Sequence, residues 1–525
     1  MTATSPPRTS GVTKRNDAVH TPTRDGARAR RTAIIWTLAS IVVAWALRAP
    51  YLGLPLRLDE GGLALVGRAF VQAGGHANGS MYGGLWIDRP PLLIALYGGA
   101  EHLGGAMGVR LLGFVGATAT IALVAAIVAR IGSLRAVPYA CGVAVALTSS
   151  PRLSGSFAYP ELLASAVTAG VALLVVRQLT SSRVVVTSWL AAGALALMAL
   201  LLKQSFLDGL AVGFVGACIA ARRATWRCTL LPFLAGVGMV AAATAAWTVT
   251  IGPGVRPLIY AMFGFRIDAA HALEASPIPM SVRFDHLAAA AVDAALPMLL
   301  PCAIVAVVLL VRRRQSGVAV VVATWLGAGI VGVLGGGYYW SHYMLQLVPV
   351  LAVLSGVTIQ AIGSHRMRAG VVVATLGFLF VVTVPDAIRR GGQLHQVPVT
   401  SAAAIVAENR APSDTMLVTY SRANLAYYTH VRPAFPYQWS LMYSAIPGVE
   451  QRLQALLGSP TRPTWIIGWQ PARTFGLDRH GTTAALIDSH YHAVGRTCGH
   501  DVLIRDDDAR VVDPGPTISR AACRS

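Results

Sequence analysis

Four carboxylate side chains stand close to the ends of apolar stretches, where chemistry at a membrane surface could use them. Asp59 and Glu60 open a polar segment near the start of the chain, and Asp88 lies near its end. Glu161 stands at the start of a later apolar run. Ionisable groups near lipid are costly and are often functional. A positioned carboxylate can accept the proton of an attacking hydroxyl, although a solvated loop would account for any one of these residues alone.

Basic and aromatic side chains at the ends of other apolar runs could bind a phosphate. Arg89 directly follows the second acidic site, and Lys203 ends a run without charge. The chain contains two lysines, Lys14 and Lys203, among many arginines. A lone lysine in the middle of the fold favours a use for its compact ammonium, such as phosphate binding. The alternative is that Lys203 only extends toward lipid headgroups. His342 and Tyr343 stand at the end of a later apolar run.

A divalent metal could bind to Asp59, Asp88 and Glu161, because carboxylate oxygens are ligands of Mg²⁺ and Ca²⁺. No ligand spacing in the sequence demands a metal, and the sequence contains no Cys-x-x-Cys or His-rich zinc pattern. The sequence therefore requires no cofactor, and a divalent metal stays an open alternative.

These residues need a scaffold that brings them together, and the composition indicates a membrane protein. The chain is 54% hydrophobic and 13% charged, whereas soluble globular proteins average about 25% charged residues. The segments Val184–Leu202, Thr229–Ile251 and Gly317–Leu334 contain no charged residue. An apolar run of about 20 residues crosses a bilayer as a helix, because lipid offers no partners to backbone groups. The predicted fold class is a polytopic α-helical membrane protein with a small C-terminal α/β domain.

The arginine clusters predict eleven spans, with the N-terminus in the cytoplasm and the C-terminus outside. Cytoplasmic loops carry an excess of arginine and lysine, and clusters of arginine alternate with the apolar runs. The segment Pro90–Gly105 is short and contains two polar ionisable residues, so we expect a membrane-surface or re-entrant helix there. Counting it as a span would reverse all later spans. The expected spans are 33–52, 109–129, 136–150, 160–176, 184–202, 205–221, 229–251, 294–311, 317–334, 343–362 and 370–385.

The net charge of +20 does not indicate nucleic-acid binding in this chain. The arginines fall in short clusters between apolar runs, as expected beside a membrane. A nucleic-acid interface would show a basic face interleaved with aromatic residues, and no such pattern is found in the sequence. The lipid bilayer is the expected partner of this charge, and no nucleic acid is expected to bind.

Composition divides the chain into three regions. Residues 1–31 are polar and rich in Pro, Thr and Arg, which predicts a disordered cytoplasmic tail. Residues 32–386 form the expected transmembrane domain, with an extracytoplasmic loop at 53–108 and a further outside loop at 252–293. In residues 387–525 charged and turn residues return, which predicts an extracytoplasmic α/β domain.

The C-terminal region is expected to contain buried strands at Met416–Tyr420 and Thr464–Gly468, and a loose tail after Arg505. Cys498 and Cys523 are the only cysteines of this region. An outside compartment permits disulfides, so we hypothesise that these two cysteines pair. Sequence separation alone does not establish that they can reach each other.

The order of the motifs resembles a known family of membrane enzymes. The matching elements are Leu58-Asp59-Glu60, Asp88-Arg89-Pro90-Pro91, Arg110-Leu111-Leu112, Glu161, Lys203 and the stretch from His342-Tyr343 to Pro349. In this order they resemble the GT-C glycosyltransferases, in the branch of protein O-mannosyltransferases and lipid A aminoarabinose transferases. The resemblance covers roughly residues 33–385, and no motif transfers to the C-terminal domain.

The resemblance implies inverting transfer of a sugar from a polyprenyl-phosphate donor on the outer face of the plasma membrane. It implies that Asp59 is the general base, which deprotonates an acceptor hydroxyl on a glycan, lipid or protein. It also implies that Arg89 and Lys203 bind the donor phosphate. Glu60, Asp88, Glu161, His342 and Tyr343 are then expected beside the substrate or a metal. These five complete the candidate site.

The sequence departs from the family pattern at three places. Gly61 and Gly62 follow Asp-Glu where the family often has a bulky residue, Arg89 replaces a lysine, and Glu161 stands where Asp is common. These departures leave the sugar, the acceptor and the role of Glu161 open.

Two other classes of function compete with an enzyme. A transporter or lipid flippase would place ionisable residues near the bilayer midplane, where Asp208 is the main candidate. A noncatalytic assembly protein would use the outside domain as a binding module. The position of most candidate residues at the outer ends of spans favours the glycosyltransferase.

Overall fold

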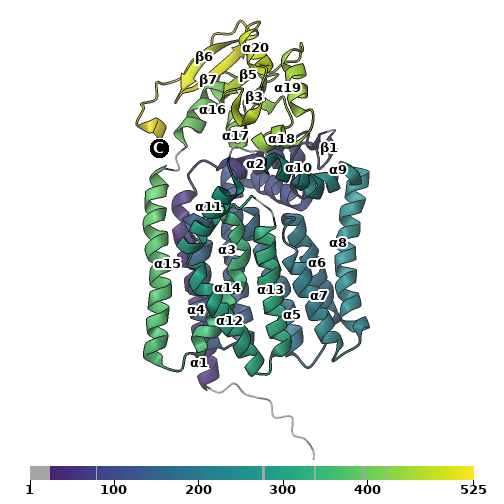
Figure 1. Ribbon diagram of the computed structural model, residues 1–525, viewed down its shortest axis with the longest axis vertical. Helices are drawn as coiled ribbons and strands as arrows, with labels where there is room; N and C mark the ends of the chain where they lie inside the picture. Colours follow the sequence, from purple (N-terminus) through teal and green to yellow (C-terminus); the bar gives the residue numbers. More distant parts are fainter. Residues whose placement is uncertain are drawn as a thin grey trace, which may run out of the picture.

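The computed structural model describes residues 24–78, 80–274, 278–335, 338–393, 396–420 and 422–524. A long bundle of helices carries a compact C-terminal domain at one end (Figure 1). The bundle helices are α1 (Arg24–Arg48), α3 (Pro91–Ile131), α4 (Val137–Thr148), α5 (Pro160–Thr180), α6 (Val186–Leu202), α7 (Asp208–Ala221), α8 (Leu230–Thr250), α12 (Leu296–Arg312), α13 (Ser316–Leu334), α14 (Val348–Ala361) and α15 (His365–Gln393).

Each of the eleven predicted spans coincides with one of these helices or its short extension. By length and hydropathy, six helices of the described chain can cross a membrane, or seven if the bent pair of α11 (Met280–Asp293) and α12 counts as one span. Three more, at Leu134–Thr148 and in α6 and α7, are apolar but shorter. The structure thus supports a multi-pass membrane protein, and the count of eleven spans stays a prediction.

The N-terminal boundary of the bundle differs from the prediction. Residues 1–23, predicted to be disordered, lie outside the described residues, but α1 already begins at Arg24. The predicted disorder is therefore wrong for residues 24–31, where arginine and alanine favour a helix and Asp25 lies in its first turn.

The predicted surface helix is a separate arm of α3. Gly104 and Gly105 have non-helical backbone angles, and Gly105 has φ 56°, which glycine adopts at little cost. This kink separates Pro91–Leu103 from the longer arm that follows. The first arm packs against α2 (Leu58–Gln72), where a Cβ on Gly67 or Gly98 would overlap the backbone of the other helix. The outer loop therefore brings α2 and the first arm of α3 together as a pair.

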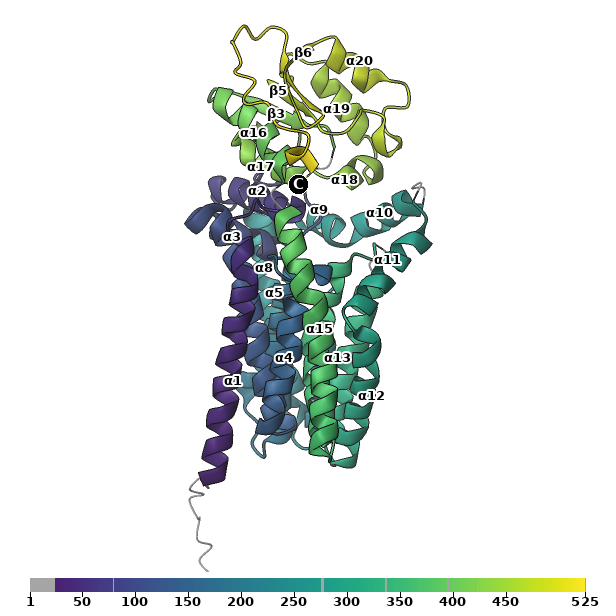
Figure 2. The ribbon, with the colours of Figure 1, turned by 90° about the vertical axis from the view of Figure 1, so that its left-hand side faces the viewer.

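The predicted outside loop at 252–293 is largely helical. It contains α9 (Val255–Ile259), a π-helical turn (Tyr260–Gly264), α10 (Phe265–Glu274) and α11. Figure 2 shows α10 and α11 diverging from the bundle at the end that carries the C-terminal domain. Val255, Ile259, Phe263 and Ile267 are exposed at a spacing of four residues. Such an apolar stripe is typical of a helix that lies at a membrane surface.

The C-terminal domain is a mixed five-stranded sheet with helices around it. The strand order is β4-β3-β5-β7-β6, in which β3 runs parallel to β4 and β5, and β7 runs antiparallel to β5 and β6. Its strands are β3 (Thr415–Val418), β4 (Arg432–Pro433), β5 (Trp465–Gly468), β6 (Tyr491–Thr497) and β7 (His500–Arg505). Its helices are α16 (Val397–Asn409), α17 (Ala423–Thr429), α18 (Ser440–Ala445), α19 (Val449–Leu457) and α20 (Thr482–Asp488). The two predicted strands correspond to β3 and β5.

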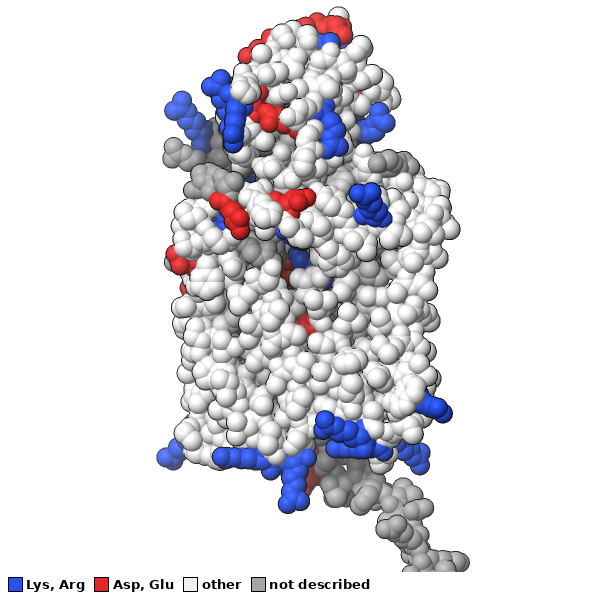
Figure 3. All heavy atoms as spheres, turned by 45° about the vertical axis from the view of Figure 1, so that its right-hand side comes forward, with Lys and Arg blue, Asp and Glu red and all other residues white. Residues whose placement is uncertain are grey.

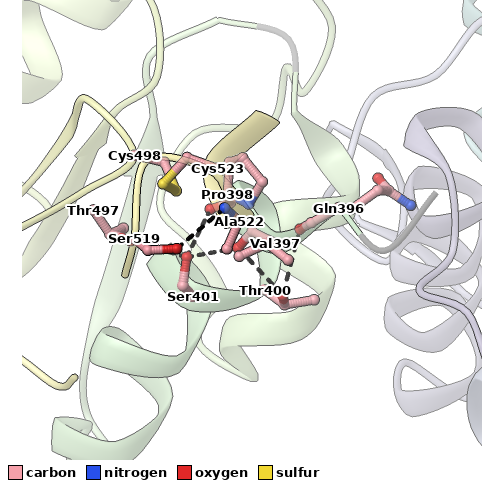
Figure 4. The surroundings of a disulfide bond; sticks show 10 residues. All are labelled: Gln396, Val397, Pro398, Thr400, Ser401, Thr497, Cys498, Ser519, Ala522 and Cys523. Carbon is pink, nitrogen blue, oxygen red and sulfur yellow. Dashed lines mark hydrogen bonds between the residues drawn. A yellow bond between two sulfur atoms is a disulfide. The ribbon is translucent and has the colours of Figure 1, made fainter. Parts of the chain in front are cut away.

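Two expectations for the C-terminal domain need correction. Its predicted start at residue 387 falls inside α15, because Pro385 does not end that helix. The tail after Arg505 is attached rather than loose, since Arg510 donates to both oxygens of Asp414 at 2.7 and 2.9 Å. The hypothesised disulfide between Cys498 and Cys523 is present and fixes the end of the tail beside α16 (Figure 4).

Candidate active site

The carboxylate of Glu60 anchors the start of helix α2. It accepts hydrogen bonds from the backbone N–H of Arg57 at 3.1 Å and of Ala158 at 2.9 Å. It also pairs with Arg110 on the second arm of α3 at 3.2 Å, and both side chains are buried. A buried carboxylate needs such partners, because a buried charge left without them is strongly destabilising. These partners fix the helix that carries Asp59, and the place of Glu60 beside the substrate or a metal stays a prediction.

Asp59 differs from the other acidic residues of the site. It lies in the first turn of α2 and is half-buried. Among the side chains that the structure describes, only Trp439 donates a hydrogen bond to it, from Nε1 to Oδ1 at 3.3 Å. No basic group of the described residues lies within ion-pair distance of it. Its carboxylate therefore keeps an oxygen that can accept a proton from a bound molecule.

Asp88 holds two arginines at the point where the outer loop returns to the bundle. Its Oδ2 lies 2.7 Å from Arg89 Nη1 and 2.5 Å from Arg266 Nη2. Burial opposes ionisation of Asp88, but Arg266, Arg89 and Lys203 outweigh it and hold its pKa below the usual value. Burial likewise opposes the charge on Arg89, but Asp88 and the more distant Tyr343, Asp59 and Glu161 together outweigh it, so the pKa of Arg89 is raised. The charged forms of Asp88 and Arg89 are therefore both favoured.

A second cluster joins the ends of α5, α6 and the turn before α14. Lys203 Nζ lies 2.6 Å from Glu161 Oε1, and His342 Nε2 lies 3.7 Å from the same oxygen. The Lys203 ammonium also stands 4.8 Å from the centre of the Tyr343 ring. The ring of His342 stacks on Tyr159 with centroids 4.4 Å apart. Pro160 starts α5 directly before Glu161, so the helix start fixes this carboxylate.

The two clusters are neighbours. Gln204, next to Lys203, donates from Nε2 to the backbone oxygen of Asp88 at 2.8 Å. The charges of Lys203 and Asp88 also act on each other. The charge of Asp59 reaches both Arg89 and His342. The structure therefore brings together residues from the outer loop and from three distant segments of the bundle, namely the start of α5, the end of α6 and the turn before α14.

Three contributors were not among the predicted site residues. Arg266 lies on α10, in a segment expected to be an outside loop. The only sequence feature that could have singled it out is its position as a basic residue among apolar neighbours. Arg110 belongs to a matching motif, but the sequence does not reveal its partner Glu60. Trp439 comes from the C-terminal domain, where no motif singles it out. Contacts between segments this far apart leave no periodic pattern in the sequence.

One oxygen of each of two carboxylates is paired with basic side chains. Asp88 Oδ2 lies on Arg89 and Arg266, and Glu161 Oε1 lies on Lys203. Among the residues that the structure describes, no group of three or more His, Cys, Asp or Glu side chains is placed to hold a metal ion.

Figure 3 shows acidic and basic side chains set back in a hollow of an otherwise uncharged wall, just below the C-terminal domain. Basic side chains gather at the opposite end of the bundle in the same view. Charged groups recessed in a wall of lipid-facing character are suited to the polar head of a lipid.

No family model and no curated protein matches this chain. Solved structures do match it. ArnT from Cupriavidus metallidurans with bound undecaprenyl phosphate has a TM-score of 0.63 at 14% identity and covers 93% of this chain and 100% of its own. The archaeal oligosaccharyltransferase AglB from Archaeoglobus fulgidus, with an inhibitory peptide and a dolichol-phosphate, has a TM-score of 0.52 at 11% identity and covers 90% of this chain and 74% of its own.

The apo form of the same ArnT has a TM-score of 0.60 at 16% identity, with 91% of this chain and 98% of that chain covered. Both proteins have the GT-C fold. The likeness shows that this chain has the GT-C fold as well, which confirms the fold suggested by the motif order. The match includes the C-terminal region, for which the sequence offered no resemblance.

Proposed function

We propose that this chain is a membrane glycosyltransferase that moves a sugar from a polyprenyl-phosphate donor to a hydroxyl acceptor on the outer face of the plasma membrane. The observation that carries the proposal is that the site holds an unpaired carboxylate beside a separate group of cations. One carboxylate, Asp59, has no basic partner in the described chain, whereas the cations Arg89, Arg266 and Lys203 gather on paired carboxylates beside it. Such a site separates a proton acceptor from a phosphate-binding group.

In the proposed reaction Asp59 takes the proton of the acceptor hydroxyl as its oxygen attacks the anomeric carbon of the sugar. The bond between that carbon and the phosphate oxygen breaks, and the polyprenyl phosphate leaves with the electron pair. Attack on the face opposite the leaving group inverts the anomeric configuration. The basic side chains stabilise the negative charge that develops on the phosphate.

The cations retain donors for a phosphate although each is already paired. A guanidinium has five N–H donors and an ammonium has three. Arg89 uses Nη1 for Asp88, and Lys203 has one carboxylate partner, Glu161. The carboxylates then orient the cations, and the remaining donors can face the donor phosphate. The bound undecaprenyl phosphate of ArnT and the dolichol-phosphate of AglB support a lipid of this class.

A transporter would need an ionisable residue that is free near the midplane of the bilayer. Asp208 was the candidate for that role. It is fully buried, and its Oδ1 accepts from its neighbour Gly209 N–H at 3.0 Å and from Thr168 Oγ1 at 3.4 Å. Asp208 starts α7 with its Oδ1 held by these neighbours and its side chain shielded from solvent, and this burial favours the glycosyltransferase.

The test is to incubate the purified protein in lipid with a panel of labelled polyprenyl-phosphate sugars and to measure donor consumption. We expect one donor to be consumed by the wild type. Asp59→Asn keeps the shape of the side chain but removes most of its basicity, and it should lower turnover by roughly 10²–10⁴-fold while donor binding persists. Asp285→Asn, an exposed residue on α11, is the matched control. Near wild-type turnover in Asp59→Asn would exclude this base.

A further inference from the structure

The segment before helix α2 is held by the C-terminal domain. The Leu56 N–H donates to Tyr428 Oη at 2.6 Å, and the Leu56 carbonyl accepts from Asn424 Nδ2 at 3.1 Å. Gln396 Nε2 donates to the carbonyls of Pro55 at 3.0 Å and Leu56 at 3.1 Å. Asn424 is fully buried in this contact. The backbone that leads into Asp59 is therefore fixed from outside the bundle.

Two glycines allow the C-terminal domain to approach α2 closely. A Cβ on Gly61 would overlap Asn424, and a Cβ on Gly62 would overlap the ring of Trp439. Both glycines lie in the regular helix, so space rather than backbone conformation requires them. This accounts for the departure at Gly61 and Gly62, since a bulky side chain there would keep α17 and Trp439 away from the helix.

Trp439 reaches from this contact to the proposed base. It stands directly before α18, and its indole N–H is the single donor of its side chain. That donor is directed to Asp59 Oδ1 at 3.3 Å. The hydrogen bond occupies one oxygen and limits the rotation of the carboxylate, so the other oxygen can face an acceptor.

We propose that Trp439 is a positioning residue for Asp59, so that the C-terminal domain completes the active site. The inference rests on the proposed function, in which Asp59 is the base. A hydrogen bond to a charged group is among the stronger ones in proteins. Small misplacements of a reacting group lower rates strongly, by up to about 10²-fold for 1 Å. Trp439 therefore acts on turnover through the geometry of Asp59.

The first test is Trp439→Phe, which removes the N–H and keeps an aromatic ring. Turnover should fall about tenfold or more, while donor affinity and the melting temperature stay close to those of the wild type. Trp469→Phe is the matched control. Trp469 belongs to the same domain, but its ring stacks on His500 with centroids 3.8 Å apart and does not contact Asp59. Unchanged turnover in Trp439→Phe would overturn the proposal.

The second test moves the indole without changing it. Gly62→Ala places a methyl group where the Trp439 ring lies, so we expect the ring to shift and its hydrogen bond to Asp59 to be disturbed. We expect a loss of turnover similar to that of Trp439→Phe. Gly53→Ala is the control on the same loop, because a Cβ there meets nothing within 4 Å. Equal turnover in both alanine variants would contradict the proposed role of the contact.

A double-mutant cycle separates positioning from a general effect on the fold. If Trp439 acts through Asp59, then Trp439→Phe should have little further effect in the Asp59→Asn background. An equal loss in both backgrounds would show that Trp439 acts elsewhere. Full turnover in Asp59→Asn would exclude Asp59 as the base. Loss of turnover in Asp59→Asn together with full turnover in Trp439→Phe and Gly62→Ala would exclude only the role of Trp439.

Discussion

At the scale of single residues, the acidic groups of the site differ in what holds them. Glu60, Asp88 and Glu161 each have at least one basic partner, at 3.2, 2.5 and 2.6 Å respectively. Asp59 has an indole N–H instead. A carboxylate that is neutralised by a nearby cation is a poor proton acceptor, because the cation favours its charged form. The partners of these side chains therefore assign different tasks to residues of similar chemistry.

The donor phosphate gives a prediction at this scale. Lys203→Ala and Arg89→Ala should each weaken binding of the polyprenyl-phosphate donor and lower turnover, because both cations would contact the phosphate in the ground state and as it departs. Lys203→Arg keeps the charge with a different shape and should lose less. Equilibrium binding of a labelled donor measures the effect.

The control for donor binding is Arg256→Ala, an exposed arginine on α9. If Lys203 and Arg89 only contact lipid headgroups, both variants should bind the donor as the wild type does. That result would place the phosphate site elsewhere.

The chemistry of the site could be predicted from residue types, but the side chains that contact the predicted residues could not. Asp59, Arg89 and Lys203 stand out because charged groups are unusual beside apolar runs. Their neighbours Arg266 and Trp439 depend on how α10 and the C-terminal domain fold back over the bundle. That arrangement follows from packing between segments hundreds of residues apart, which leaves no local signal.

At the scale of elements, helix α2 is the part that positions the proposed base. The buried pair of Glu60 and Arg110 ties its first turn to the second arm of α3. Glu60 also binds the backbone at Ala158, directly before the segment that leads to Glu161. One carboxylate thus connects the outer loop, the longest helix and the start of α5.

Removing Arg110 should destabilise this junction. Arg110→Met leaves the carboxylate of Glu60 buried without its partner, which typically costs about 3–5 kcal/mol. We expect a lower melting temperature in detergent and reduced turnover. Arg496→Met, which breaks the exposed pair with Asp501, should cost about 0–1 kcal/mol. Equal melting temperatures for the two variants would show that the buried pair contributes little.

The long apolar elements were accessible from the sequence, and the short amphipathic ones were not. Runs without charge predicted the bundle helices, and arginine clusters separated them. The loop at 252–293 contains charged residues, and its apolar and polar residues alternate too weakly to predict α9, α10 and α11. Short helices are marginal on their own, so these helices depend on the elements against which they pack.

At the scale of the whole molecule, charge defines two ends. Basic side chains gather at the end of the bundle away from the C-terminal domain (Figure 3). The positive-inside rule predicts that this end faces the cytoplasm. Reporter fusions after Arg314 and after residue 395 should therefore report opposite sides of the membrane, with the second one outside. Both reporters on one side would overturn the predicted topology.

The disulfide of the C-terminal domain gives a further prediction. Cys498 and Cys523 should be resistant to alkylation in freshly isolated protein and reactive after reduction, as mass spectrometry can detect. Replacing both with serine should destabilise the C-terminal domain by about 2–4 kcal/mol. Cys218→Ser, a free cysteine of α7, is the control. Two free thiols in unreduced protein would contradict the disulfide.

The hydrogen bonds from the C-terminal domain to the segment before α2 also have a consequence for how the protein is made. The ribosome produces the Asp59 segment early, whereas Gln396, Asn424, Tyr428 and Trp439 follow more than three hundred residues later. Until these residues have been synthesised, the backbone at Pro55 and Leu56 lacks the partners that hold it. A nascent or truncated chain would therefore reach the bilayer with its donor-binding groups present but its base unsecured. Completion of synthesis itself would then determine when the enzyme becomes active.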